Sequence, residues 1–418
     1  MKNSLLIFLL LIFTSGFAQE VLSLSDCYSL AVTNHPIAKQ NELIPQQNEL
    51  NTDIINTKKL PKIDFDAQAT YQSDVIHFPT ENPGLLIEIP NKDQYRATLT
   101  VNQLIYGGGS INAAIEDENA KSKAQQQTIQ VELYQIKPKI NQLYFSILLL
   151  QEKKDLLLAK QKQLQEKLKE VKAGIKYGAV LPSSDSVLEA ELLKLEQQLT
   201  EIESSKINLN QTLEKYLGVP INNSTSFIYP ETSETLSNSL NRPELDLFNL
   251  QKDQIDYTST IISKDRMPKI YGFAQGGYGN PGLNMLDNSF QAFYIVGLKL
   301  NWNVFDWNQT KKKTQALELN KQFIDTEKEK FKLYTSIQME QQLIEINKYQ
   351  EFINSDQTII KLHKKILETA DSQLKNGVIT SSDYIEKLTD LYEAENNLKT
   401  HQIQLLLSQA NYKTIQGI

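Results

Sequence analysis

Seven-residue spacing of apolar side chains is the feature that most constrains the fold. In one stretch the spacings alternate between four and three residues. A period of 3.5 residues keeps one narrow face of a helix against a neighbouring helix, which is coiled-coil geometry. A helix over residues 110–175 would be on the order of 100 Å long, and no compact domain accommodates that length. The stretch contains Ile129, Leu133, Ile136, Ile140, Leu143, Ile147, Leu150, Leu157 and Leu164.

The same spacing recurs further along the chain, so the protein is predicted to be mainly helical, with long antiparallel hairpins. Pro138 lies inside the first long stretch and should kink it, because proline lacks an N–H and clashes with the preceding turn. The later stretches contain Leu188, Leu192, Leu195, Leu199 and Ile202, and then Ile346, Ile353, Ile360, Leu367 and Leu374.

The chain consists of two similar halves. We predict a first repeat over residues 19–221, a polar linker over 222–241 and a second repeat over 242–418, because the same local sequences recur in the same order. Pro61-Lys62-Ile63 recurs as Pro268-Lys269-Ile270, Lys176-Tyr177-Gly178 as Lys375-Asn376-Gly377, and Ser183-Ser184-Asp185 as Ser381-Ser382-Asp383.

Each half is predicted to contain a short helix, two strands and two long helices. In the first half the strands cover about 62–74 and 94–106, and the long helices 110–175 and 183–217. In the second half the strands cover about 269–279 and 289–305, and the long helices 308–375 and 381–416.

The predicted strands alternate between apolar and polar residues. Ile63 and Phe65 share one face of the first strand, with Asp64 and Asp66 on the other. Soluble sheets also alternate, so this pattern alone does not identify a membrane sheet. Aromatic residues near the strand ends favour a lipid-facing band flanked by aromatic girdles. These residues are Tyr71, Tyr95, Phe290 and Trp302.

Four strands cannot form a closed membrane barrel alone. They leave two open edges, which lipid does not tolerate, and membrane barrels need at least about eight strands. Several copies of the chain must therefore pool their strands. Two copies would give eight strands with a filled interior, and three would give twelve with room for a channel. The pattern itself does not decide between these numbers.

The first residues resemble a secretory signal. Lys2 supplies a positive charge, residues 5–13 form an apolar core, and small residues precede a cleavage site near Ala18. A lipid anchor is not expected, because Cys27 lies well beyond the apolar core. No later stretch approaches the apolar length that a membrane-spanning helix requires, so strands are the predicted membrane-crossing elements.

Composition and spacing give no basis for an enzyme, a cofactor or a metal site. The single cysteine excludes a disulfide framework, and the net charge of -7 argues against a nucleic-acid partner. Gly107-Gly108-Gly109-Ser110 lacks the Gly-Lys-Ser/Thr of a phosphate loop and is interpreted as a turn. The histidines are scattered and are interpreted as surface residues. They are His35, His77, His363 and His401.

Together these features resemble the outer-membrane efflux protein family, the TolC-like channels, over essentially the whole chain. The opening segment from Leu22 to Ala31, followed by Asn34-His35-Pro36, is similar to the N-terminal signature of that family. The segments from Gly178 to Leu188 and from Gly377 to Leu388 are similar to its hairpin tips.

The resemblance implies a homotrimer in the outer membrane of a Gram-negative bacterium, with a twelve-stranded β-barrel and a twelve-helix periplasmic tunnel. It implies a periplasmic adaptor protein and an inner-membrane transporter as partners. The expected function is passive conduction of exported substrates. The alternative is a periplasmic coiled-coil scaffold or a surface adhesin without a pore, whose strands form a soluble sheet.

The resemblance places adaptor docking at the two hairpin tips. Glycine permits a sharp reversal, and Ser183 or Ser381 could cap the returning helix. The alternative is that the tip residues only build turns. The tip residues are Gly178, Ala179, Val180 and Leu181 in the first half, and Gly377, Val378, Ile379 and Thr380 in the second.

The resemblance also implies an acidic gate. Asp383 and Glu386 match acidic positions near the tunnel entrance, and Asp185 is the related position in the first half. Three copies would form a carboxylate ring that attracts cations. Alternatively, an Asp in the first helical turn only offsets the helix dipole. Ile379 and Leu374 replace a basic residue and a tyrosine of the family, so the closing contacts between subunits do not carry over.

Overall fold

The computed structural model describes residues 21–76, 89–178, 180–222, 225–230 and 239–418. The predicted signal over 1–18, the tip residue Ala179 and part of the predicted linker lie outside the described residues. The described chain is mainly helical, with one four-stranded sheet and one small two-stranded sheet. It divides into two compact units, and each unit takes segments from both predicted repeats. The repeat boundaries themselves remain a prediction.

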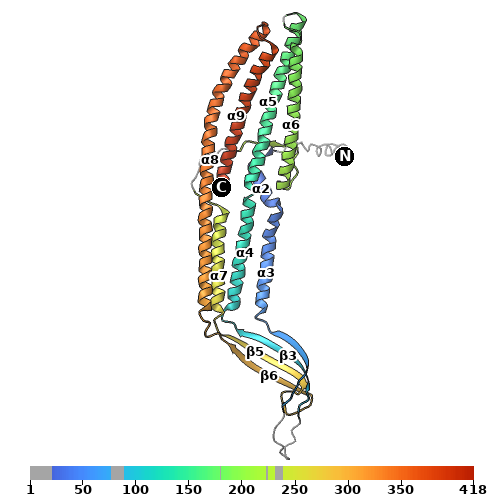
Figure 1. Ribbon diagram of the computed structural model, residues 1–418, viewed down its shortest axis with the longest axis vertical. Coiled ribbons are helices and arrows are strands. Elements are labelled where there is room, and N and C mark those ends of the chain that lie inside the picture. The colour runs from blue at the N-terminus through green and yellow to red at the C-terminus, as the bar shows by residue number, and fades with distance from the viewer. Residues whose placement is uncertain (1–20, 77–88, 179, 223–224, 231–238) are drawn as a thin grey trace, which may run out of the picture. The chain divides into compact units, whose positions relative to one another are not determined.

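The first unit comprises the described residues up to Gln40, together with 128–245 and 329–418. Two helical hairpins form most of it, one from α5 and α6 and the other from α8 and α9 (Figure 1). The helices are α2 (Leu24–Asn34), η1 (Pro36–Lys39), α5 (Lys137–Lys176), α6 (Ser184–Leu217), α8 (Gln309–Lys375), of which the C-terminal part belongs here, and α9 (Ser381–Gln416). The short strands β1 (Val21–Leu22) and β4 (Ser226–Phe227) pair in parallel.

The first long helix is divided at its proline, at the place where the kink was predicted. α4 (Ser110–Tyr134) ends before α5 begins at Lys137, and Pro138 occupies the first turn of α5. Proline cannot donate to the carbonyl of Tyr134, four residues earlier, and its ring would clash with that carbonyl. The break therefore has a local covalent cause.

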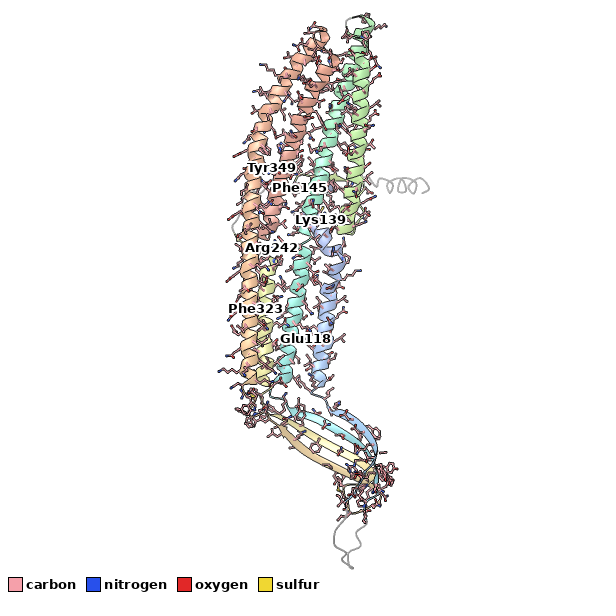
Figure 2. The ribbon with its side chains drawn as sticks, viewed as in Figure 1. Glu118, Lys139, Phe145, Arg242, Phe323 and Tyr349 are labelled. Atoms are coloured by element: carbon pink, nitrogen blue, oxygen red, sulfur yellow. The ribbon has the colours of Figure 1, made fainter. Side chains whose placement is uncertain are left out.

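The heptad residues form the buried apolar seam of the two hairpins. Leu157, Leu164 and Val171 of α5 repeat every seven residues and are buried. A second buried cluster surrounds Phe145, which Figure 2 labels on α5. Burying each large apolar side chain contributes about 1.5–3 kcal/mol, so this seam is the main source of stability in the unit. The other buried members are Leu188, Leu195, Ile360, Leu367, Ala370, Leu374, Tyr384, Leu388, Leu391 and Ala394.

Two lysines of α5 are buried beside this seam and connect it to the other helices. Lys160 Nζ donates to Glu191 Oε1 on α6 at 3.1 Å and to Thr389 Oγ1 on α9 at 3.2 Å. Lys167 pairs with Asp371 on α8. A charged group removed from water must find its partner, so each pair fixes the register of the packed helices.

The N-terminal segment packs against the first unit through specific polar contacts. Ser23 and Asp26 form a capping box at the start of α2. Tyr28 Oη donates to Asn141 Oδ1, and Asn34 Nδ2 donates to the Leu217 carbonyl at 2.8 Å. Cys27 is fully buried, and burial raises the pKa of its thiol to about 12, so it is an unreactive packed side chain.

The second unit comprises residues 41–127 and 246–328. Its helical segments belong to α3 (Gln40–Thr57), α4, α7 (Pro243–Lys264) and the first part of α8. Polar contacts join them in pairs. Asn51 Nδ2 donates to Glu118 Oε1 of α4 at 2.6 Å, and Glu118 is labelled in Figure 2. Lys252 of α7 pairs with Asp325 of α8 at 2.8 Å.

The four-stranded sheet of this unit is antiparallel throughout, in the order β2-β3-β5-β6. Its strands are β2 (Lys62–Tyr71), β3 (Asp93–Tyr106), β5 (Lys269–Asn280) and β6 (Gln291–Asn301). β6 ends at Asn301, so residues 302–305 of the predicted strand instead lead into α8. β2 and β6 each pair on one side only within the described chain.

The strand register places the apolar residues of all four strands on one face. Phe65 is opposite Leu99, Leu99 is opposite Gly276, and Gly276 is opposite Tyr294. Residues opposite each other on neighbouring strands share a face of the sheet. The apolar residues, which alternate with polar ones in each strand, therefore form one continuous apolar surface. The large exposed side chains of this apolar face include Ile63, Phe65, Tyr71, Tyr95, Leu99, Tyr278, Tyr294, Val296, Leu298 and Leu300.

The opposite face is polar and holds two aromatic rings that lie over glycines. A Cβ on Gly297 would be 2.8 Å from Phe273 Cζ, and a Cβ on Gly277 would overlap the ring of Phe293. The absent side chains let both rings lie close against the neighbouring strand. Arg96 stacks on the Phe293 ring, with its guanidinium carbon 5.6 Å from the ring centroid.

Among the helices of the described chain, none combines the length and the apolar character required to cross a lipid bilayer.

Candidate functional site

The second hairpin tip is a regular helix-ending turn at Gly377. The Gly377 N–H donates to the Leu374 carbonyl at 3.0 Å, and the Val378 N–H donates to the Gln373 carbonyl at 2.9 Å. These two bonds form a Schellman motif, which requires a left-handed residue after the helix. Gly377 has φ of 69°. Glycine adopts this conformation without a steric penalty, which explains its place in the sequence.

The returning helix α9 is capped by Thr380 and not by Ser381, so that part of the cap prediction is wrong. Thr380 Oγ1 accepts from the Asp383 N–H at 3.3 Å, and the Thr380 N–H donates to Asp383 Oδ2 at 2.9 Å. This reciprocal pair is a capping box. The Ser381 hydroxyl is buried and has no hydrogen-bond partner among the described residues.

The first tip makes the same reversal with a weaker helix start. Gly178 has φ of 73°, and its N–H donates to the Ile175 carbonyl at 3.1 Å. Ser183 precedes α6 in a left-handed conformation with φ of 74°, and its side chain caps nothing. The prediction that Ser183 is a side-chain cap is therefore also wrong. A left-handed residue cannot present its hydroxyl as a β-region N-cap does.

Grooves at the tips bring some of the predicted residues together. Ile379 and Asp383 both line a groove of about 330 Å³, whose other wall includes Ile366 and Thr369 of α8. A second groove, of about 540 Å³, lies between the first turns of α6 and α9. Its lining includes Ser183, Ser186, Val187, Ser382 and Ile385. Asp185 and Glu386 do not line either groove.

The three predicted gate carboxylates have different surroundings. Asp383 is part of the capping box, Glu386 pairs with Lys387 at 2.5 Å, and Asp185 Oδ1 accepts from the Ser186 N–H at 2.9 Å. Asp383 therefore has a local role in capping α9, in the first helical turn where the alternative to a gate was that it only offsets the helix dipole. The two roles do not exclude each other, because one carboxylate can cap a helix and still carry charge.

The capping box controls the ionisation of Asp383. Hydrogen bonds from the Thr380 N–H and hydroxyl lower the pKa of this carboxyl below its ordinary value of 3.8. A carboxylate with a lowered folded pKa stabilises the folded state fully above its unfolded pKa. That contribution is lost as the pH falls through the lowered folded pKa. Asp383 is therefore ionised at neutral pH.

His401 was predicted to be a surface residue, but its side chain is partly buried. Its Nδ1 lies 2.6 Å from Asp356 Oδ2, between α9 and α8, and its ring contacts Phe352 with centroids 5.0 Å apart. The spacing along the chain gave no sign of this pair, because it forms across two helices. No group of three side chains suited to bind a metal occurs among the described residues.

The chain is similar in structure to solved outer-membrane channels. The CmeC outer membrane channel of Campylobacter jejuni has 16% sequence identity and a TM-score of 0.65, with 94% of this chain and 85% of CmeC covered. VceC of Vibrio cholerae has 15% sequence identity and a TM-score of 0.65, with 94% of this chain and 96% of VceC covered. The open state of the MtrE channel of Neisseria gonorrhoeae has 16% sequence identity and a TM-score of 0.63, with 94% of this chain and 89% of MtrE covered.

No protein-family model and no curated protein sequence matches the chain. At identities this low, similarity of structure establishes the fold. The fold is that of these solved outer-membrane channels, so the resemblance predicted from the sequence is confirmed at the level of the fold.

Replacing Thr380 with Ala should destabilise the start of α9 by about 1 kcal/mol, because one orphan N–H loses its acceptor. Hydrogen exchange of the first-turn amides of α9, measured by mass spectrometry, should then be about fivefold faster. Ser381→Ala is the matched control and should leave this exchange unchanged, because its hydroxyl has no partner. Equal acceleration in both variants would contradict the assignment of the cap.

Proposed function

We propose that this chain is one subunit of an outer-membrane channel that passively conducts exported substrates from the periplasm, or from an inner-membrane transporter, to the exterior. The observation that carries the proposal is the continuous apolar face across four strands, backed by a polar face and bounded by two open edges. The fold shared with solved outer-membrane channels supports it.

The open edges are what make several copies necessary. The strand order β2-β3-β5-β6 is fully antiparallel, so β2 and β6 run in opposite directions. Under rotational symmetry, β6 of one copy can therefore pair with β2 of the next copy in antiparallel fashion. Three copies give twelve strands and a polar interior. We therefore propose a homotrimer whose helices continue the channel as a periplasmic tunnel.

The apolar face favours a channel over a soluble scaffold or adhesin. A soluble antiparallel sheet exposes its polar face to water and buries its apolar face. Here no described helix covers the apolar face, and its side chains are exposed from Ile63 on β2 to Leu300 on β6. Lipid is the environment in which such a face is stable. The channel role requires no catalytic residue.

Replacing Leu298 with Arg should prevent membrane insertion, because a cation on the lipid-facing side of a barrel costs about 2–4 kcal/mol near the bilayer centre. Ile295→Arg is the matched control, because Ile295 lies on the polar face of the same strand. The measurements are the yield of heat-modifiable trimer in the membrane fraction and the single-channel conductance in planar bilayers. A water-soluble monomer of the unaltered protein would contradict the proposal.

We also propose that the tips dock a periplasmic adaptor protein. The turns are exposed, and Val378 in particular is 69% exposed. The grooves beside Ile379 and between Val187 and Ile385 would accept apolar side chains from a partner helix. This arrangement matches the tip role that the family resemblance implies for Gly178, Val180, Leu181, Gly377, Val378, Ile379 and Thr380.

A cysteine at Val378 should crosslink to the adaptor in intact cells when Cys27 is replaced by Ser. Val378 is preferred over Gly377, because Gly377 has a positive φ that a cysteine would strain. Glu201→Cys, on the exposed side of α6, is the control and should give no crosslink. Docking at this tip would be excluded if both cysteines captured the same partner. It would also be excluded if the cysteine at position 378 captured no partner during active export.

We further propose that Glu386, Asp383 and Asp185 supply the negative charge of the tunnel entrance when the tunnel is closed. Glu386→Gln is the informative variant, because Asp383 also caps α9. It should lower the cation-to-anion permeability ratio, measured as a smaller reversal potential in a potassium chloride gradient. Glu393→Gln, an exposed carboxylate further along α9, should leave the ratio unchanged. An unaltered reversal potential in Glu386→Gln would remove this residue from the gate.

A further inference from the structure

The four junctions between helices and strands lie at one end of the sheet. Lys62 of β2 is opposite Asn102 of β3, and Lys269 of β5 is opposite Asn301 of β6. Each of these positions is five to eight residues along the chain from a helix. Aromatic and basic side chains gather at these junctions. We call Lys264, Arg266, Trp302, Phe305, Trp307, Lys311, Lys312 and Lys313 the collar.

Along one continuous segment, the side chains change from apolar to aromatic to basic. Leu298 and Leu300 belong to the apolar face of β6. The chain then presents Trp302, which is 54% exposed, and Phe305, which is 66% exposed. Three consecutive exposed lysines follow among the first five residues of α8. This order reproduces the profile of a membrane boundary, where aromatic rings lie at the headgroups and cations lie beyond them.

The backbone at Trp307 indicates that its indole has a role beyond building the turn. Trp307 has φ of 52° and Asn308 has φ of 61°, and these two residues directly precede α8. At the same place before α4, the chain uses Gly108 and Gly109, with φ of 63° and 82°. A bulky residue is strained in this region, and glycine is not. The turn therefore retains a strained tryptophan that is 81% exposed.

Trp307 is also ordered relative to its aromatic neighbour. Its ring meets the ring of Phe305 edge to face, with centroids 4.8 Å apart. Because Phe305 is 66% exposed and Trp307 is 81% exposed, the pair forms a small exposed apolar surface. Strain that persists at an exposed aromatic site is typical of a position used for binding.

The collar is strongly cationic in a chain whose net charge is -7. Residues 264–268 and 302–313, which contain the whole collar, hold five Lys or Arg and two carboxylates. Both carboxylates are already engaged. Asp265 pairs with Lys269 at 3.1 Å, whereas Asp306 Oδ2 accepts from the Thr310 N–H at 3.0 Å and lies 4.0 Å from Nε of the collar residue Arg266. Within the described chain, Lys311, Lys312 and Lys313 have no carboxylate within 4.0 Å.

We propose that the collar binds anionic phospholipid headgroups at the membrane surface nearest the helices. The phosphates would meet Lys264, Arg266 and the three lysines of α8, while Trp302, Phe305 and Trp307 occupy the interfacial layer. Each lysine near an anionic surface strengthens association on the order of fivefold. The inference rests on the proposed channel function, since it requires the apolar face to lie in lipid.

The collar carries its own reporter, because Trp302 and Trp307 are the two tryptophans of the chain. In a Trp302→Phe background, the fluorescence of Trp307 alone is measured in the full-length trimer reconstituted into phosphatidylethanolamine vesicles. Two sets of vesicles are compared. One contains phosphatidylglycerol and the other contains the same mole fraction of phosphatidylcholine, and in each set this lipid is brominated near the top of its acyl chains. We expect at least twofold stronger quenching by brominated phosphatidylglycerol. The preference should decrease at about 1 M salt, where charge interactions extend only about 3 Å.

Replacing Lys311, Lys312 and Lys313 together with Gln should abolish the preference for the anionic lipid while leaving quenching by phosphatidylcholine unchanged. The matched control removes three exposed lysines from the later part of α8, at Lys332, Lys361 and Lys365, and should retain the preference. Both variants lose three positive charges, so a difference in their lipid preference depends on where the lysines lie along α8. Trp307→Gly should leave the thermal stability of the trimer unchanged or higher, because glycine suits the positive φ.

Strong and equal quenching by the two brominated lipids would overturn the collar proposal and leave the channel function intact. No quenching by either lipid would place Trp307 away from the membrane and would overturn both. The collar could instead bind the cell wall. In that case the detergent-solubilised trimer would sediment with purified peptidoglycan, the triple lysine variant would not, and the two brominated lipids would quench Trp307 equally.

Discussion

Within the described residues, the backbone groups along the outer edges of β2 and β6 are unpaired, and this is the constraint on which the rest of the architecture depends. Every N–H and C=O on an edge strand must find a partner where water is absent. A chain with two such edges and one apolar face has few stable arrangements, and joining identical copies edge to edge is the simplest. An even number of antiparallel strands per chain makes that joining uniform, because each new contact repeats the antiparallel pairing already present within the sheet.

The fold could be predicted well from periodicity, because the pattern and the structure share a cause. The seven-residue spacing of Leu157 and Leu164 identified a buried helical face, and the two-residue spacing in the strands identified the apolar face of the sheet. Pro138 marked the division between α4 and α5 through its own covalent structure. What periodicity could not supply was the pairing of Lys160 and Lys167 across helices. Lysines in a charged helix are usually solvated, and only three-dimensional packing shows which ones are buried.

The candidate sites were less predictable, because their details depend on backbone conformation. Thr380 and Asp383 have the three-residue separation of a capping box, and that signal was present in the sequence but was assigned to Ser381. Ser183 could not have been excluded as a cap without its left-handed φ. The pairing of His401 with Asp356 joins residues that are distant along the chain. The Thr380–Asp383 capping box is local and could have been predicted from sequence, whereas the left-handed Ser183 and the contacts between helices could not.

The rings of Phe273 and Phe293 have a consequence for the bore of an assembled channel. Each ring occupies the volume that a side chain on Gly297 or Gly277 would otherwise fill, so aromatic groups on the inward face add little thickness to the wall. Adding a single methyl group at either glycine would tilt a ring inward, and rotational symmetry would repeat that obstruction in every subunit. In the proposed channel, two absent methyl groups in each subunit would thus set the clearance available to cargo in this part of the pore.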